Sequence, residues 1–190
     1  MKFSKSLIPR IFLILFINQI FFNVPKAQSA EKIKIIYSIF SRTVTVDSLN
    51  NFANNGNSSK SLRQILNATG SSDDEIRSVL NNNFEIPITI ASKLVYSEIG
   101  NVVLNRMSSI LHTPNTNDKK TGMLAIRSSV IKGLYTGNGK INLVSFFESY
   151  PTKTVILNVN ALSKVMNKVQ SISELLDFFT SKPLEKIKKN

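Results

Sequence analysis

The residues whose types and spacing most suggest chemistry lie in the stretch YTGNGKINLVSFFESYPT, residues 135–152. Gly137 and Gly139 stand just before Lys140, which invites comparison with phosphate-binding loops. A P-loop needs the spacing G-x-x-x-x-G-K-[ST]. Here the glycines are two positions apart and an isoleucine follows the lysine. A dinucleotide-binding loop needs a third glycine where this chain has Asn142. The stretch therefore matches neither phosphate motif.

Ligand chemistry argues against a calcium site in the same stretch. With Gly139 as the glycine of an EF-hand loop, the ligand positions would fall on Leu134, Thr136, Asn138 and Ser145. None of them is a carboxylate, and a hard dication without carboxylate ligands binds feebly. We interpret the stretch as a turn between helices that leads on into a strand. The residues given this structural role are Gly137, Gly139, Tyr150, Pro151 and Thr152.

Two other groups could do chemistry, and both have a structural explanation. Asp73, Asp74 and Glu75 are consecutive, so on a helix they diverge and converge poorly on one metal ion. They suit the first turn of a helix, where the dipole favours negative charge. His112, the only histidine, is expected at a helix end, bonding backbone carbonyls. With no cysteine and no G-x-S-x-G elbow, we predict no catalytic residue, no cofactor and no metal ligand.

The elements that position these residues begin with KIKIIYSIFSRTVTV, residues 32–46, whose β-branched and aromatic content predicts a β-hairpin. Asp47 is expected to cap a short helix that ends at Gly56. A second helix is expected to end at Gly70, and Ser72 with Glu75 has capping-box spacing for a third. The first half of the chain thus predicts a hairpin followed by helices.

The second half continues the helical pattern. A break is expected at residues 97–100, followed by a helix ending before Pro114. A longer helix then leads to Gly137, which is expected to be left-handed. KTVILNV, residues 153–159, predicts a third strand, and Asn160 is expected to cap the next helix. Ser171 and Glu174 have the spacing of another capping box.

The predicted fold class is α+β and mostly helical, with an N-terminal hairpin, a third strand and six to eight short helices. Residues 30–181 are expected to form a single domain, a normal size for one hydrophobic core. Residues 182–190 are expected to form a basic, mobile tail.

The segment at positions 1–29 has the pattern of an export signal. Basic residues precede an apolar run at positions 11–24. This run is too short to cross a bilayer as a helix, which takes about 20 residues. Small residues follow, and we predict cleavage after Ser29, so that Ala30 begins the mature chain. The expected location is the periplasm or the thylakoid lumen. The alternative is a protein tethered to the membrane by an uncleaved N-terminus.

Charge narrows the classes of partner. The chain has 24 Lys and Arg against 12 Asp and Glu, and loss of the signal with its four basic residues would leave 20 against 12. A basic surface could face nucleic acid or anionic lipid. No Arg-rich platform with interleaved aromatic residues is present, so we predict no nucleic-acid partner. Weak contact with a membrane surface stays open, beside the simpler interpretation of a solvated lysine surface.

The order of motifs resembles a cyanobacterial family of unknown function, whose domain occurs alone or in front of an α/β-hydrolase domain. The resemblance rests on three segments, VTVDSLNNFANNG, SEIGNVVLNRMSSILHTP and AIRSSVIKGLYTGNGKINLVSFFESYPTKTVILNV. The chain departs from the family pattern at Asn138 and Asn160, where aspartate is expected. The resemblance implies a link to hydrolases, without a visible nucleophile in this chain.

We therefore expect an exported, non-enzymatic accessory domain that binds a partner protein or a lipid-like ligand. One alternative is a hydrolase-related enzyme that uses His112 with an unrecognised serine. Another is a basic module that binds anionic membrane surfaces. The ligand, the partner and the oligomeric state stay open.

Overall fold

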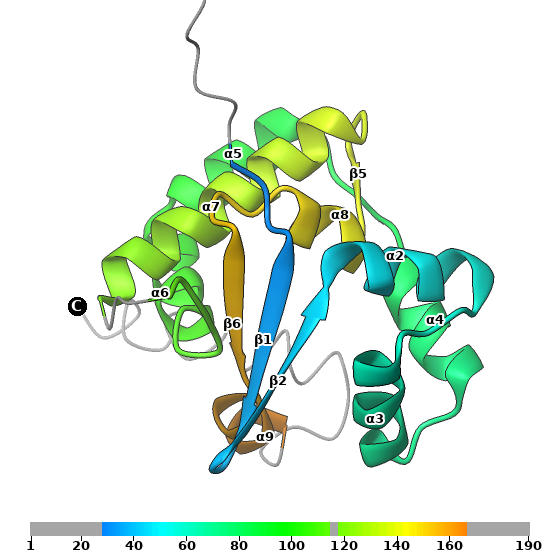
Figure 1. Ribbon diagram of the computed structural model, residues 1–190. Helices are drawn as coiled ribbons and strands as arrows, with labels where there is room; N and C mark the ends of the chain where they lie inside the picture. Colours follow the sequence, from blue (N-terminus) through cyan, green and yellow to red (C-terminus); the bar gives the residue numbers. More distant parts are fainter. Residues whose placement is uncertain (1–27, 115–117, 167–190) are drawn as a thin grey trace, which may run out of the picture.

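A computed structural model describes residues 28–114 and 118–166 (Figure 1). Its main sheet has the strand order β2-β1-β6-β4. The four strands are β1 (Lys32–Tyr37), β2 (Phe40–Thr45), β6 (Thr154–Asn158) and β4 (Leu111–His112). β1 pairs antiparallel with β2 and parallel with β6, and β4 pairs antiparallel with β6. The predicted hairpin and third strand are thus confirmed, and they are neighbours in one sheet.

Eight helices and a second, two-stranded sheet complete the described part of the chain. The small sheet pairs β3 (Phe84–Glu85) with β5 (Lys140–Ile141). The helices are α2 (Val46–Asn55), α3 (Lys60–Thr69), α4 (Asp73–Asn81), α5 (Ile88–Tyr96), α6 (Glu98–Met107), α7 (Lys119–Thr136), α8 (Leu143–Glu148) and α9 (Val159–Met166). The fold is α+β and mostly helical, as predicted.

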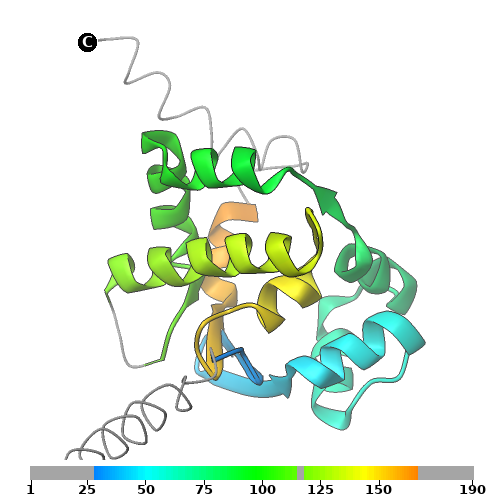
Figure 2. The ribbon, with the colours of Figure 1, turned by 90° about the horizontal axis from the view of Figure 1, so that it is seen from above.

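The long helix α7 organises the packing. Figure 2 shows α7 between α5 and α6 on one side and α8 on the other, and it contacts all three. The side chains of Ile126 and Leu134 on α7 are almost fully buried, as is Val155 of the central strand β6. Phe52 of α2 and Tyr150, just after α8, are also fully buried. One continuous core therefore joins the sheet to α7.

Most of the predicted helix boundaries are confirmed, because they depend on local signals. Gly56 and Gly70 end α2 and α3 with φ of 74° and 71° respectively. This is the left-handed conformation that glycine tolerates best. Ser72 and Glu75 form the predicted capping box of α4. The break before α6 is also present, with Ser97 as its N-cap.

Two predicted caps are wrong by two residues. The cap of α2 is Thr45 and not Asp47, since the Thr45 hydroxyl accepts a hydrogen bond from Ser48 N at 3.0 Å. At α9, Asn158 Oδ1 accepts from Ala161 N at 3.0 Å. Asn160 instead accepts from Ser38 N in the hairpin turn, so a long-range contact replaces the local one.

The helix predicted to end before Pro114 is shorter than expected. α6 ends at Met107, and His112 lies in β4, opposite Ile156 of β6. His112 is therefore not at a helix end, and its Nδ1 lies 3.2 Å from the carbonyl oxygen of Thr113. A two-residue strand has too little pattern to be visible in the sequence.

The described core begins at Ala30, whose side chain is buried, and Glu31 N donates a hydrogen bond to Lys153 O at 2.9 Å. Ser29 is exposed. The apolar run at residues 11–24, the second capping box at Ser171 and the tail at 182–190 lie outside the described residues.

Candidate functional site

The glycine turn between α7 and β5 differs from the prediction in its geometry. Gly137 has φ of −91° and is not left-handed, whereas Asn138 and Gly139 have φ of 51° and 88°. Position 137 needs glycine for a different reason, because a Cβ there would lie 2.0 Å from Lys140 O. Gly139 N donates to Leu134 O at 2.8 Å and closes the turn.

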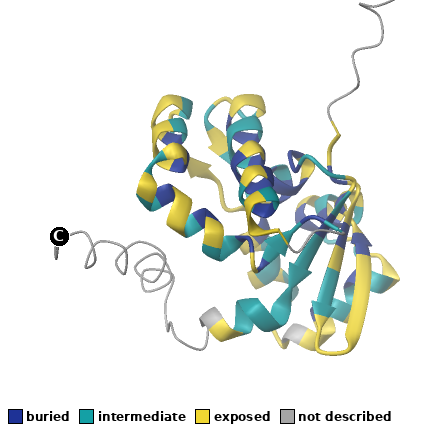
Figure 3. Cartoon of the chain, turned by 90° about the vertical axis from the view of Figure 1, so that its left-hand side faces the viewer, coloured by how far each residue is buried: buried dark blue, intermediate teal, exposed yellow. Residues whose placement is uncertain are grey.

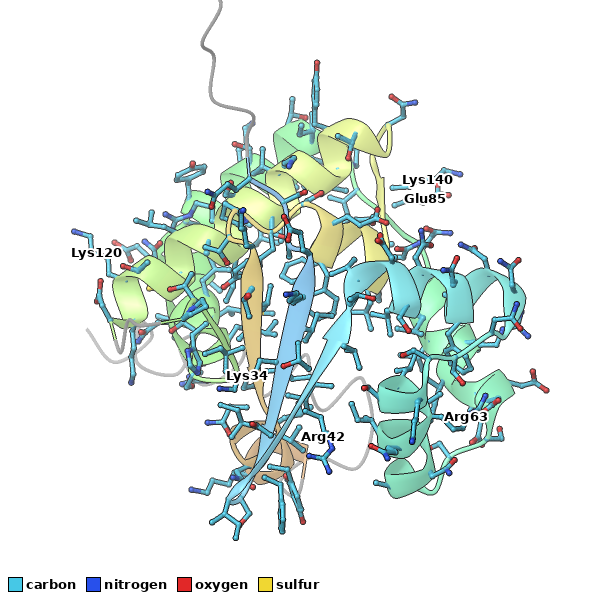
Figure 4. The ribbon with its side chains drawn as sticks, viewed as in Figure 1. Lys34, Arg42, Arg63, Glu85, Lys120 and Lys140 are labelled. Atoms are coloured by element: carbon cyan, nitrogen blue, oxygen red, sulfur yellow. The ribbon has the colours of Figure 1, made fainter. Side chains whose placement is uncertain are left out.

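The side chains of this turn do not converge on a ligand. Lys140 Nζ forms an exposed ion pair with Glu85 across the small sheet, at 2.8 Å (Figure 4). Ser145, the last ligand position of the calcium alternative, forms a reciprocal capping box with Asn142 at the start of α8. Their polar groups are thus occupied in starting a helix.

The segment after α8 delivers the chain to β6. The ring of Tyr150 is fully buried and packs edge-on against Phe146, with 6.1 Å between centroids. Burial raises the pKa of its hydroxyl well above the usual range, because the charged form would be desolvated. Thr152 Oγ1 donates to Thr154 O at 2.8 Å where the strand begins. Pro151 lies half-buried between them. These contacts are structural.

The remaining sequence candidates also lie apart from one another. Asp73 forms an ion pair with Arg63 at 2.8 Å, and Glu75 occupies its capping box. Among the residues that the structure describes, His112 has no serine or carboxylate partner. The same part of the chain contains no group of three His, Asp or Glu residues that could hold a metal ion.

A different place has the form of a binding site: a groove of ≈640 Å³ between α5 and α7. Three of its lining side chains are apolar or aromatic and largely exposed, namely Tyr96 (64%), Leu124 (51%) and Tyr135 (75%). Ile88 and Ile131 extend the apolar lining. Ligand sites are hollows of roughly 300–1,000 Å³ with such a lining and a few polar groups.

Arg127 holds the two walls of this α5–α7 groove together. Its side chain is buried, with Nε donating to Val95 O at 3.0 Å and Nη2 donating to Asn101 Oδ1 at 2.6 Å. The guanidinium carbon also lies 4.6 Å from the centroid of the Tyr96 ring, a cation–π contact. The cation sits at the C-terminal end of α5, where the helix dipole favours positive charge. Arg127 thus fixes α5, α6 and the groove aromatic together.

The other polar groups of the groove are not used by the fold. Within residues 28–114 and 118–166, the Ser92 and Ser128 hydroxyls and the Lys132 ammonium have no hydrogen-bond or ion-pair partner. Two hydroxyl donors and one cation therefore border an apolar hollow. This arrangement suits an elongated apolar molecule with an acidic end.

The sequence places Arg127 in the segment AIRSSV but indicates no role for it. One signal was present: Arg127 follows Met123 by four positions and precedes Val130 by three, so it occupies the apolar stripe of α7. A charged residue in such a stripe needs a buried partner. The partners themselves are on α5 and α6, and no local pattern indicates them.

Comparison with protein families gives one match. Residues 29–158 match the family described as "Alpha/beta hydrolase of unknown function (DUF1400)". The chain belongs to DUF1400. The match covers the sheet, α7 and the α5–α7 groove, and it confirms the resemblance to a family of unknown function with a hydrolase label. No curated protein and no solved structure matches the chain.

A helix that crosses a membrane must be both long and apolar. In the described ranges, no helix meets these two requirements.

Proposed function

We propose that this DUF1400 domain is an exported, non-enzymatic binding module that holds a lipid-like, acidic ligand in the α5–α7 groove. One observation carries the proposal: exposed aromatic and aliphatic side chains line a hollow beside unpaired donors. An acyl chain would cover Leu124 and Tyr135, and its carboxylate would be drawn to Lys132. Export rests on the signal pattern of residues 1–29.

A binding assay with dodecanoate and the uncharged dodecanol tests the proposal. Both compounds would compete with a fluorescent apolar dye, and the wild-type protein is expected to prefer the carboxylate. Replacing two exposed groove residues, Leu124→Asn with Tyr135→Ser, is expected to weaken both by about tenfold. Lys132→Ala is expected to abolish only the preference for the charged compound.

Lys120→Ala is the matched control, because it removes a lysine from the same helix outside the groove lining. It should leave both affinities unchanged. Equal binding by the wild type, the groove double variant and the control would overturn the groove as a ligand site.

A hydrolase-related activity is the alternative that the family description favours. Turnover of p-nitrophenyl butyrate by the purified full chain, with and without His112→Ala, separates the two functions. Hydrolysis that disappears in this variant would replace the binding-module proposal by an enzymatic one.

A further inference from the structure

The apex of the β1–β2 hairpin exposes more apolar surface than a turn usually does. Three of the four residues at positions 37–40 are large and apolar, and their exposed fractions are 59% for Tyr37, 89% for Ile39 and 62% for Phe40. Figure 3 shows the hairpin end in the exposed colour, and Figure 1 shows it at the far end of the strands from α7. A group of large exposed apolar side chains is a candidate interaction surface.

The backbone of the apex is held in place by the ladder and by a contact with α9. Tyr37 pairs with Phe40 as the last pair of the ladder, and Ser38 has the left-handed φ of 53°. Ser38 N donates to Asn160 Oδ1 at 3.2 Å, which fastens the turn to α9. The three apolar side chains are therefore presented on a fixed backbone.

The described elements around the apex contain basic residues and no acidic ones. Residues 32–45, 59–70 and 154–166 form the hairpin, α3 and the β6–α9 region, and none of them is Asp or Glu. Their basic residues are Lys32, Lys34, Arg42, Lys60, Arg63 and Lys164. Only Arg63 has an ion-pair partner in the part of the chain that the structure describes, namely Asp73. The local field around the apex is therefore positive.

Along the hairpin, the apolar residues lie at the apex and the basic residues lie further from it. Arg42 pairs with Ile35, two ladder positions above the Tyr37–Phe40 pair, and Lys34 lies one position further. At the usual rise of a strand these steps amount to about 7 Å for Arg42 and about 10 Å for Lys34. Both are labelled on the hairpin in Figure 4. Amphipathic elements bury their apolar part roughly 5–10 Å below the lipid headgroups, which is the depth this spacing provides.

An apolar cleft of ≈520 Å³ adjoins the apex. It lies between the hairpin, α3 and α9, and its lining includes Ile35, Phe40, Arg42, Ile65 and Val159. Arg42 thus borders both the exposed apex and an apolar hollow. A guanidinium in this place suits a phosphate diester, which it binds through paired hydrogen bonds.

We propose that the β1–β2 apex docks on anionic phospholipid bilayers, with Tyr37, Ile39 and Phe40 entering the interface and Arg42 and Lys34 contacting lipid phosphates. This site is separate from the α5–α7 groove, so either proposal can fail alone. A peptide that adds beside β2, which is an edge strand of the described sheet, would also cover this region. The bilayer is favoured because edge pairing uses backbone groups alone and gives no role to the apolar apex and its cations.

The chain has no tryptophan, so a single one introduced at the apex reports on that place alone. The experiment uses the full chain with Phe40→Trp, titrated with vesicles of phosphatidylglycerol and phosphatidylcholine, or of phosphatidylcholine alone. We expect a blue shift of emission with the anionic vesicles, and its loss as salt rises from about 0.05 to about 0.5 M. Phe84→Trp, at an exposed position of β3 that lines neither the α5–α7 groove nor the apolar cleft beside the apex, is the control and should not shift.

Two substitutions in the Phe40→Trp protein separate the charged and apolar contributions. Arg42→Ala should weaken vesicle affinity about fivefold, the usual effect of one basic residue at a membrane surface. Ile39→Asn should reduce the blue shift, because it removes an apolar side chain that would enter the bilayer. The side chain of Ile39 is 89% exposed, so it does not support the core. Lys120→Ala removes one charge far from the apex and should change neither quantity (Figure 4).

The proposal is overturned by three outcomes. One is an unshifted emission from position 40 with anionic vesicles, which would leave protein partners as the candidates for this surface. Another is an equal shift with uncharged vesicles at all salt concentrations. The third is an equal loss of affinity in Arg42→Ala and Lys120→Ala.

Discussion

The hairpin apex and the glycine turn share a backbone feature and differ in nearly everything around it. Each contains a non-glycine residue in the left-handed region, Ser38 with φ of 53° and Asn138 with φ of 51°. At the glycine turn the backbone closes on itself and leaves no space for a Cβ on Gly137, although the Asn138 side chain is exposed. Around Ser38 the side chains face solvent, and Ile39 is 89% exposed. Similar local backbone therefore serves packing in one place and presents a surface in the other.

This comparison shows why motif spacing misleads here. The glycine turn has the residue types of a ligand loop, yet its groups are occupied by helix caps and a small sheet. The apex has no motif, yet it exposes three large apolar side chains at the free end of the hairpin. Exposure, which a single sequence does not record, separates the two.

The largest expected effect is from Gly137→Ala. Its Cβ would lie 2.0 Å from Lys140 O, so the turn must open. We expect a loss of about 3 kcal/mol in the free energy of unfolding, measured by urea denaturation followed by circular dichroism.

Gly139→Ala is the matched control for this substitution. A Cβ at position 139 would meet only Ile86 O, at 3.6 Å, although the φ is left-handed. The strained backbone alone should cost about 1 kcal/mol. A smaller loss for Gly137→Ala than for Gly139→Ala would contradict the steric explanation.

The next effect concerns Arg127, which links α5, α6 and α7. Arg127→Lys keeps the charge but loses the planar fork and the stacking on Tyr96. We expect a loss of about 2 kcal/mol in unfolding free energy and weaker dodecanoate binding in the groove. Lys120→Arg, the reverse exchange at an exposed site, should change neither. Full stability of Arg127→Lys would mean that the buried guanidinium is not needed to hold the groove.

What the sequence predicts well is what depends on near neighbours. Capping by Ser72, the left-handed ends at Gly56 and Gly70, and the break at Ser97 all involve residues a few positions apart. The parallel pairing of β1 with β6 joins Lys32 to Thr154, and no periodicity specifies such a contact. The same holds for the two-residue strands, which depend on partners far along the chain.

The candidate sites follow the same rule. The apolar residues of KIKIIYSIFSRTVTV predict the strands, but the same residue type stands at Ile33, inside β1, and at Ile39, in the turn between β1 and β2. These two residues are nevertheless 2% and 89% exposed. Whether such a residue is core or surface depends on whether other elements extend beside it. The partners of Arg127 are likewise set by the α5–α6 corner.

A smaller effect on stability is expected when the two left-handed residues, Ser38 and Asn138, are replaced by glycine. Asn tolerates this conformation better than Ser, because its side chain hydrogen-bonds locally. Ser38→Gly should therefore raise the free energy of unfolding by about 0.5–1 kcal/mol, and Asn138→Gly by less. Thermal melts of both variants provide the measurement. The hydrogen bond from the backbone N of position 38 to Asn160 does not use the serine side chain and stays in place. A loss of stability in Ser38→Gly would show that its side chain supports the apex.

The smallest effect is expected from Lys140→Ala, which decides whether the stretch at residues 135–152 binds an ion. The ion pair with Glu85 is exposed on both sides, and such pairs contribute little once salt screens them. The hydrogen bond and charge of Glu85 raise the pKa of Lys140. Any stabilisation is therefore present at neutral pH and is lost as pH rises through that raised value.

Because an exposed ion pair contributes so little, the melting temperature of the Lys140→Ala variant at pH 7 should be close to that of the wild type, with or without millimolar Ca²⁺ or phosphate. The measurement is a thermal melt of the full chain in each condition, with Asn138→Ala beside it. If either ion raised the melting temperature of the wild type and not of Lys140→Ala or Asn138→Ala, the turn would be a binding site. The glycine turn would then be a binding surface like the hairpin apex, and no longer a purely structural turn.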